Sequence, residues 1–367
     1  MSLGRAWVHA LPGKLISASR HGYSGIEIFH EDLIYHARSL FPDATSPRAA
    51  QLAAAHDIRQ LCRSLNLSII NLQPFSQYDG LRDRAAHEQR LHELSFWFEL
   101  ARALDTDLIQ VPASFLPEAQ CTGDLDVIVA DLQEISDMGA RQNPPIRFAY
   151  EALCWSTHVD TWEKSWEVVQ KVDRENFGIC LDTFNIAGRI YADPTSATGK
   201  MADAEEAVKQ SIKKMLDVLD VNKVFFIQIV DAERLDAPLV EGHPYYDAEQ
   251  PCRMSWSRNC RLFYGETGRG AYLPVRAITD AIINDLGFQG WVSMELFNRS
   301  MADPAPSTPE EHARRGAAAW KKMIDEIGLD VRDSRADSPL VQDKISNHHD
   351  MVFERIENVQ EPLMALL

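Results

Sequence analysis

Four apolar runs in this sequence close with a side chain that could bind a cation. These residues are Glu151, Asp182, Gln228 and Glu295. The runs read Arg-Phe-Ala-Tyr-Glu, Phe-Gly-Ile-Cys-Leu-Asp, Val-Phe-Phe-Ile-Gln and Trp-Val-Ser-Met-Glu, a pattern typical of strands buried on both faces. Because moving an unpaired carboxylate out of water costs several kcal/mol or more, the three acids predict a common partner. A divalent metal ion would meet that need.

The four donors together form a hard, oxygen-rich set of three carboxylates and one amide. Such a set suits Mg²⁺, Mn²⁺ or Co²⁺ better than Zn²⁺, which prefers His and Cys. The alternative is that acids at strand ends cap the following helices or pair with arginines. Four such endings in successive strands favour the metal site over that alternative.

Strand-like and helix-like segments alternate from residue 12 onward, and this alternation predicts the elements that position the four residues. Strands are expected at 25–29, 68–72, 108–111, and in the four runs above. Helices are expected at 13–21, from Ser46-Pro47 onward, and at 82–104, 124–140, 160–172, 203–218, 274–286 and 308–327. Alternating strands and helices predict a parallel sheet with right-handed crossovers. Polar residues at strand carboxyl ends favour an α/β fold of the (β/α)₈ TIM-barrel type. A doubly wound sheet is the competitor, but the Gly-rich phosphate loop that usually accompanies it is absent.

The count of strands is seven rather than eight. Residues 1–11 offer only the weak candidate Ala-Trp-Val-His-Ala, so we expect the first strand to be missing or degenerate, with the sequence starting after it. Two sheet edges would then be unpaired. The long connections 185–202 and 231–272 are expected to overhang the site. Residues 1–328 are expected to form one catalytic domain, and 329–367 a polar tail.

The composition excludes several classes of protein. A net charge of −17 over 367 residues argues against a nucleic-acid groove, which needs clustered Lys and Arg. Six scattered cysteines without a Cys-x-x-Cys pair fit a reducing compartment better than a disulfide scaffold. No apolar signal core and no stretch of 18 apolar residues occur in the sequence. We therefore expect a cytoplasmic protein without a membrane partner, and a homo-oligomer remains compatible with the sequence.

Several longer blocks resemble the fungal 3-dehydroshikimate dehydratases of quinate breakdown, within the xylose-isomerase-like barrel superfamily. The resemblance spans about residues 1–327. The blocks are Phe-His-Glu-Asp-Leu (29–33), Leu-Gln-Pro-Phe-Ser-Gln-Tyr-Asp-Gly (72–80), Tyr-Glu-Ala-Leu-Cys-Trp (150–155), Leu-Asp-Thr-Phe-Asn-Ile-Ala-Gly-Arg (181–189), Met-Ser-Trp-Ser-Arg-Asn-Cys-Arg-Leu-Phe (254–263) and Met-Glu-Leu-Phe-Asn (294–298). The resemblance implies dehydration of 3-dehydroshikimate to protocatechuate with one divalent cation. The four strand-end residues fall on the family's four ligand positions.

The implied reaction needs a base for a weakly acidic C–H beside a ketone, and an acid to help the hydroxyl leave. Many relatives place a His three residues after the Asp ligand, where this chain has Asn185. An amide cannot be a base, so Asn185 is expected to donate hydrogen bonds to substrate or to metal-bound water. His30 and His243 are the candidate bases, although either could be an ordinary surface or packing histidine.

The substrate is expected to be a small carboxylated ring, which calls for a cationic fork. Arg258, in a family-like block among aromatic residues, is the preferred anchor, with Arg261 and Arg189 as alternatives. Tyr78 and Gln77 could wall the ring pocket, or they could merely shape their loop.

Two other functions remain open. The same barrel and metal could serve a sugar isomerase or epimerase, whose chemistry also passes through an enolate. Alternatively, the chain could be a truncated, catalytically inactive binding protein. Phosphodiesterase chemistry on DNA is disfavoured by the charge of −17.

Overall fold

Seven parallel strands form one sheet in the part of the chain that the computed structural model describes, residues 1–329. In sheet order they are β1 (Gly25–Phe29), β2 (Ser68–Gln73), β3 (Leu108–Pro112), β4 (Arg147–Glu151), β5 (Phe177–Asp182), β6 (Val224–Gln228) and β9 (Trp291–Ser293). Every neighbouring pair is parallel. The predicted tail lies outside the described residues, apart from its first residue.

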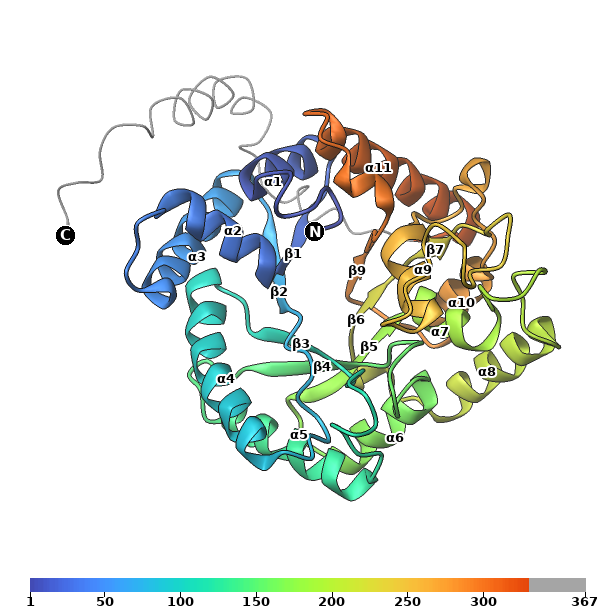
Figure 1. Cartoon of the computed structure of the whole chain (residues 1–367), viewed down its shortest axis with the longest axis horizontal. Helices are drawn as coiled ribbons and strands as arrows, with labels where there is room; N and C mark the ends of the chain where they lie inside the picture. The colour runs from blue at the N-terminus through green and yellow to red at the C-terminus, as the bar shows by residue number, and fades with distance from the viewer. Residues whose placement is uncertain (330–367) are drawn as a thin grey trace. The chain divides into compact units, whose positions relative to one another are not determined.

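Helices surround the sheet on its outer side (Figure 1). They are α1 (Leu11–Arg20), α2 (His30–Leu40), α3 (Pro47–Ser64), α4 (Arg84–Leu104), α5 (Leu125–Ala140), α6 (Trp162–Val172), α7 (Thr183–Ile190), α8 (Ala204–Val218), α9 (Cys252–Cys260), α10 (Val275–Asp280), continued by a π-helical turn at Ala281–Asp285, and α11 (Thr308–Ile327). Strands inside and helices outside, alternating along the chain, confirm the predicted barrel architecture.

Local sequence signals explain where the main helices begin. Ser46 accepts a hydrogen bond from the Ala49 amide at 3.4 Å, ahead of Pro47 in the first turn of α3. Asp83 caps α4 and Thr161 caps α6 in the same way. Each cap satisfies backbone donors that the first helical turn leaves without partners.

The inside of the sheet is built in layers. An apolar cluster, the lower layer, is formed by Leu108, Ala149, Cys180 and Phe226. Side chains two positions apart on a strand point the same way, so the next residues on these four strands also face inward. They are Gln110, Glu151, Asp182 and Gln228. A polar layer therefore lies on the lower layer, at the carboxyl ends of the strands.

The ring of strands has one discontinuity, between β9 and β1. These strands stand at the two ends of the sheet order, and residues 1–10 contribute no strand, as the strand count predicted. Side chains span the discontinuity: Ser293 donates a hydrogen bond to Glu27. A Cβ on Gly25 would lie 2.8 Å from the Trp291 ring, so only glycine permits this close approach.

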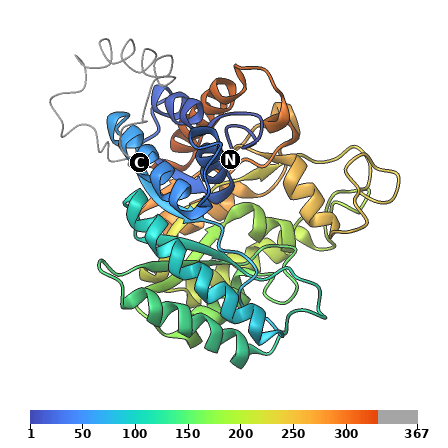
Figure 2. The ribbon, with the colours of Figure 1, turned by 60° about the vertical axis from the view of Figure 1, so that its left-hand side comes forward.

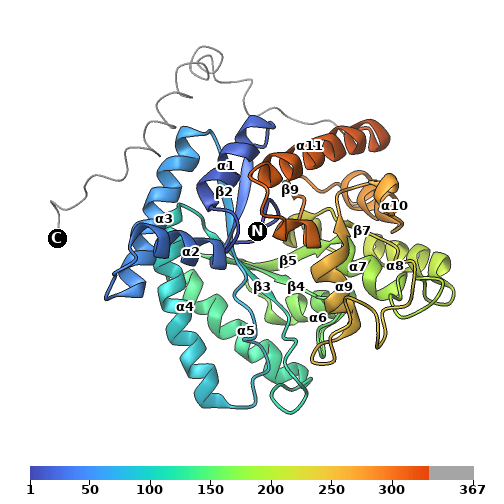
Figure 3. The same ribbon diagram turned by 45° about the horizontal axis from the view of Figure 1, so that its top comes forward.

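Helices close the ring on the outside of the same discontinuity. Ala18 of α1 packs with Ala313 of α11 and with Leu3, all buried. Figure 3 shows α1 and α11 side by side at this position. The first and last helices of the barrel thus cover the junction that no backbone ladder joins within residues 1–329.

Short elements within the connections differ from the prediction. The segment expected as a long connection at 185–202 begins inside α7, and α2 and α9 were not predicted at all. The segment 231–272 contains β7 (Asp231–Ala232) and β8 (Arg261–Leu262), an antiparallel pair that flanks α9. Figure 2 shows the part of this segment before α9, in yellow and gold, extending from the side of the barrel.

Candidate metal centre

Glu151 and Asp182 meet in the polar layer through Asn185. The Asn185 amide donates to Glu151 Oε1 at 2.8 Å and to Asp182 Oδ2 at 2.9 Å, and its own oxygen accepts from the Cys154 amide at 3.1 Å. Gln110 donates to the second oxygen of Glu151. Asn185 was predicted to donate to substrate or to metal-bound water, and in this structure it joins two of the predicted ligands.

Asp182 also caps α7, which starts at the next residue. Its Oδ1 accepts from the backbone amides of Phe184 at 2.6 Å and Asn185 at 3.2 Å. The helix cap of the alternative interpretation is therefore present, while the other oxygen faces the layer, and the role of Asp182 as a metal ligand stays a prediction. These cap hydrogen bonds hold the Asp182 carboxylate in one orientation.

Arg261 places a positive charge between two of the predicted ligands. One guanidinium nitrogen, Nη1, lies 2.7 Å from Asp182 Oδ2 and 2.8 Å from Glu295 Oε2, and Nε donates to Ser257 at 2.9 Å. The guanidinium lies 4.3 Å from the Phe184 ring centre, on the ring face that attracts cations. The side chain is 2 % exposed, so this is a buried ion-pair network. The antiparallel pair of β7 and β8 brings it there.

Glu27 of β1 links Gln228 and Glu295 through hydrogen bonds, directly to Gln228 and by way of Gln73 to Glu295. Gln228 Nε2 lies 3.2 Å from both carboxylate oxygens of Glu27. Gln73 Nε2 lies 2.7 Å from Glu27 and 3.4 Å from Glu295 Oε1. Glu295 follows β9 rather than ending it, two residues beyond Ser293. The polar layer therefore contains four carboxylates, of which the sequence predicted three.

Burial dominates the electrostatics of this layer. Desolvation raises the pKa of Glu151 well above its ordinary value, and the nearby charges of Asp182 and Glu295 raise it further. Desolvation also raises the pKa of Glu295, although Arg261 opposes the shift, and that of Glu27, although hydrogen bonds from Ser293, Asn71 and Gln228 oppose it. Both effects disfavour the ionised carboxylates, so a cation bound in this layer would stabilise their ionised form.

The donor set fits a divalent cation. Four carboxylates face one guanidinium, and the predicted ligands present only oxygen, which suits a hard ion. Within residues 1–329, no three His, Cys, Asp or Glu side chains stand together as a ready-made metal cage. Instead, protein donors hold the ligand oxygens, and a carboxylate oxygen has lone pairs for a hydrogen bond and an ion together. The residues present therefore suit a divalent cation by their oxygen donors and by their excess of negative charge.

The two candidate bases lie outside this network of hydrogen bonds. His30 begins α2 directly after β1, with Nε2 2.8 Å from Gln51 Oε1 and its ring 4.7 Å from that of Trp97. Burial lowers its pKa. His243 lies in the segment before α9, half-buried, where its Nδ1 accepts from the Tyr245 amide at 3.1 Å.

The preferred substrate anchor is also placed elsewhere. Arg258 is exposed at the end of α9, where Nη1 donates to Gln250 at 2.6 Å, and Arg189 pairs with Asp160 at 2.6 Å. Of the three arginines considered from the sequence, the structure brings only Arg261 to the predicted ligands.

Tyr78 and Gln77 occupy the loop after β2. Tyr78 is fully buried and its hydroxyl donates to the Asp131 carbonyl at 2.8 Å, which directs it toward α5. Gln77 is half-buried and has a left-handed backbone, with φ 57°. The contacts of Tyr78 and the backbone of Gln77 are those of loop-shaping residues, and a role of either at the ring pocket stays a prediction.

Sequence reasoning missed the remaining members of the polar layer: Glu27, Asn71, Gln73, Gln110 and Ser293. One signal could have found some of them. Leu-Ile-Gln-Val and Gly-Ile-Glu-Ile-Phe are apolar runs that each contain one polar residue, just as the ligand-bearing runs do. These residues were missed because they lie inside their apolar runs, whereas the predicted ligands lie at the ends of theirs.

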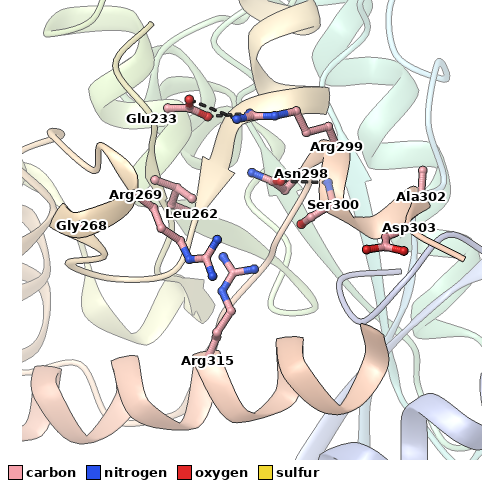
Figure 4. Close-up of a pocket in the computed structure, with 10 residues that line it drawn as sticks. All are labelled: Glu233, Leu262, Gly268, Arg269, Asn298, Arg299, Ser300, Ala302, Asp303 and Arg315. Carbon is pink, nitrogen blue, oxygen red and sulfur yellow. Dashed lines mark hydrogen bonds and ion pairs between the residues drawn. The ribbon is translucent and has the colours of Figure 1, made fainter. Parts of the chain in front are cut away.

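A separate cavity of about 670 Å³ opens beside the centre. Figure 4 shows its lining, which includes Arg269, Arg299 and Arg315. None of the predicted ligands lines it. Leu262 faces this cavity, whereas its neighbour Arg261 faces the carboxylates, as alternation along β8 requires.

The fold and the inward-facing polar layer define a class of protein, and the sequence identifies the same class. The chain belongs to the xylose isomerase-like TIM barrel family, whose sequence profile matches residues 15–323. No helix within residues 1–329 has the length and apolar character needed to cross a bilayer.

Among named proteins, a 3-dehydroshikimate dehydratase of Neurospora crassa is 56% identical over 346 residues, which cover 93% of this chain and 96% of the relative. A 3-dehydroshikimate dehydratase of Pseudomonas aeruginosa is 30% identical, and the match covers 78% of this chain and 36% of that protein.

Solved structures share the fold. A xylose isomerase-like TIM barrel/4-hydroxyphenylpyruvate dioxygenase fusion protein superposes with a TM-score of 0.65 at 24% identity, over 91% of this chain and 44% of that one. The IOLI protein with a bound zinc atom superposes with a TM-score of 0.61 at 18% identity, over 87% and 94% of the two chains.

Proposed function

We propose that this chain is a 3-dehydroshikimate dehydratase that forms protocatechuate with the help of a divalent cation, Mg²⁺, Mn²⁺ or Co²⁺. The observation that carries the proposal is the 56% identity to the Neurospora crassa enzyme over nearly the whole length of both chains. The polar layer supports it, because it supplies hard oxygen donors at the end of the barrel where this architecture carries its active sites.

The reaction removes one water from a carboxylated ring and makes the ring aromatic. A proton leaves a carbon next to the ketone, and a hydroxyl group leaves the ring with another proton as water. When bound by Glu151, Asp182, Gln228 and Glu295, the cation supplies Lewis-acid polarisation of the substrate ketone.

The residues of the chain have distinct proposed roles. Asn185 holds Glu151 and Asp182 at a fixed separation through its two hydrogen bonds, and because these use both of its N–H groups, a bond to the substrate would have to replace one of them. His30 is the preferred base, since it follows β1 at the carboxyl ends of the strands and its lowered pKa keeps the imidazole neutral near pH 7. Arg261 is the preferred anchor for the substrate carboxylate, because it lies among the ligands.

The test is turnover of 3-dehydroshikimate by the purified full chain with added Mn²⁺, followed by the absorbance of protocatechuate. Replacing Glu295 by Gln should lower kcat/KM at least roughly a hundredfold, because it removes one ligand and several kcal/mol of transition-state stabilisation. Glu167→Gln is the matched control, since Glu167 is exposed on the outer helix α6, away from the predicted ligands. Full activity of Glu295→Gln, or turnover of ketoses but not of 3-dehydroshikimate, would refute the proposal.

A further inference from the structure

An amide ligand brings an ambiguity that a carboxylate does not. A Gln side chain carries an oxygen acceptor and an NH₂ donor of nearly the same shape. Only the oxygen can face a cation. If the Gln228 amide turned over by half a rotation, it would present N–H groups to the predicted ion, and the fourth ligand would be lost. A neighbouring group must therefore fix the orientation of the Gln228 amide.

Glu27 is placed to fix this orientation. Both of its carboxylate oxygens accept from Gln228 Nε2 at 3.2 Å, so the donor end of the amide faces Glu27 in this geometry. The NH₂ end of Gln228 is therefore drawn toward β1, which leaves its oxygen on the other side. That oxygen is also the acceptor for the Cys180 thiol at 3.8 Å. Gln228 is fully buried, so no water competes for the choice.

Glu27 is itself held in place from three further positions. Asn71 donates to it at 2.9 Å and Gln73 at 2.7 Å, and Ser293 donates from β9 across the discontinuity of the sheet. Gln73 also reaches Glu295 Oε1 at 3.4 Å. One carboxylate thus contacts one predicted ligand directly and a second through a shared donor.

We propose that Glu27 is a positioning residue that fixes the amide of Gln228 with its oxygen toward the divalent cation. The inference rests on the proposed metal centre and adds a residue that binds neither the ion nor the substrate. Groups that orient metal ligands in this way are commonly worth 10–100-fold in metal affinity.

The experiment measures Mn²⁺ affinity of the full chain from the free-ion electron paramagnetic resonance signal, which does not depend on catalysis. Glu27→Gln should weaken binding about 10–100-fold, because a second amide no longer specifies the orientation. Glu27→Asp keeps the charge but shortens the side chain by one methylene, and we expect a loss of similar size. Circular dichroism and thermal melting in EDTA check that each variant folds.

The decisive variant exchanges the two groups, E27Q/Q228E. A carboxylate at 228 offers oxygen in either orientation, and the amide at 27 can donate to it. We expect Mn²⁺ affinity within about threefold of wild type, since the ligand and its hydrogen bond are both restored.

Three outcomes would overturn the inference. Wild-type affinity in Glu27→Asp would mean that charge alone matters, and an exchange variant no better than Glu27→Gln would remove the orienting role. A wild-type chain that binds no Mn²⁺ would overturn it together with the metal centre. By contrast, the expected binding pattern without turnover of 3-dehydroshikimate would keep Glu27's role and refute only the proposed reaction.

Discussion

At the scale of residues, the polar layer is held by side chains that each donate hydrogen bonds to two carboxylates. Asn185 joins Glu151 to Asp182, and Arg261 joins Asp182 to Glu295. Gln73 joins Glu295 to a carboxylate outside the predicted ligand set. Because each donor fixes two acids at once, a change at one donor moves two ligands. Effects of substitutions within this network are therefore not additive.

The pH dependence of turnover tests His30 as the base. Burial lowers its pKa below the ordinary histidine value, and only the neutral imidazole accepts a proton. As the pH is lowered, kcat/KM should therefore fall with a midpoint below pH 6.5, the usual histidine pKa. His30→Asn should cost about 10²–10⁴-fold, the usual contribution of a general base.

His243→Asn is the matched control for this prediction. His243 is the other candidate base, and it lies half-buried in the segment before α9. A wild-type profile in His30→Asn together with a large loss in His243→Asn would reverse the assignment.

At the scale of elements, the sequence predicted the strands well and the short helices poorly. All seven strands were found, and β3 and β5 are apolar runs buried over their whole length, as expected of strands covered on both faces. Strand β9 was found from its apolar residues although Trp291 is exposed. Helix α7 was missed because it begins at the residue after β5, with Asp182 as both strand end and cap. Its Gly188 lowers helix propensity, and α9 contains no apolar stripe at helical spacing. Only tertiary packing stabilises such short segments.

The same scale explains why the site was predicted in part. Ligands at strand ends are visible, since the hydrophobic pattern stops there. Arg261 could not be ranked first from the sequence, because its place depends on the pairing of β7 with β8. Glu27 stayed hidden because an acid in the middle of a strand usually faces solvent, and only the closed ring turns it inward.

The loop between β2 and α4 provides a prediction at this scale. Tyr78→Phe removes the buried hydrogen bonds of the hydroxyl with the Asp131 carbonyl and with His87 Nε2. We expect the free energy of unfolding to fall by about 1 kcal/mol, measured by urea denaturation, with kcat/KM within twofold of wild type. A large rise in KM without loss of stability would instead place Tyr78 at the ring pocket.

At the scale of the described barrel, ring closure depends on helices and side chains where the sheet has its discontinuity. Helix α11 packs at Gly316 against Tyr23, in the connection between α1 and β1, and an added Cβ would lie 2.1 Å from the Tyr23 hydroxyl. The Tyr23 hydroxyl also donates to the Ala313 carbonyl at 3.2 Å. The junction therefore has no room for a larger side chain.

Gly316→Ala tests that closure. It should displace Tyr23 and lower the free energy of unfolding by about 1–3 kcal/mol, the usual cost of overpacking, as measured by thermal or urea denaturation. Gly13→Ala in α1 is the matched control, because no atom lies within 4 Å of its added Cβ, and it should be neutral or stabilising. Equal melting temperatures for the two variants would contradict a tight junction.

The guanidinium of Arg261 bears on the order in which the protein would fold and bind a metal ion. A chain whose acidic centre relied on an external ion alone could not collapse until that ion arrived. Here the polypeptide carries its own internal counter-ion, so the barrel can assemble first and acquire its metal afterward. If the centre binds the proposed cation, we expect folding and metal loading to be separate steps, so that metal supply limits activity and not the folded state.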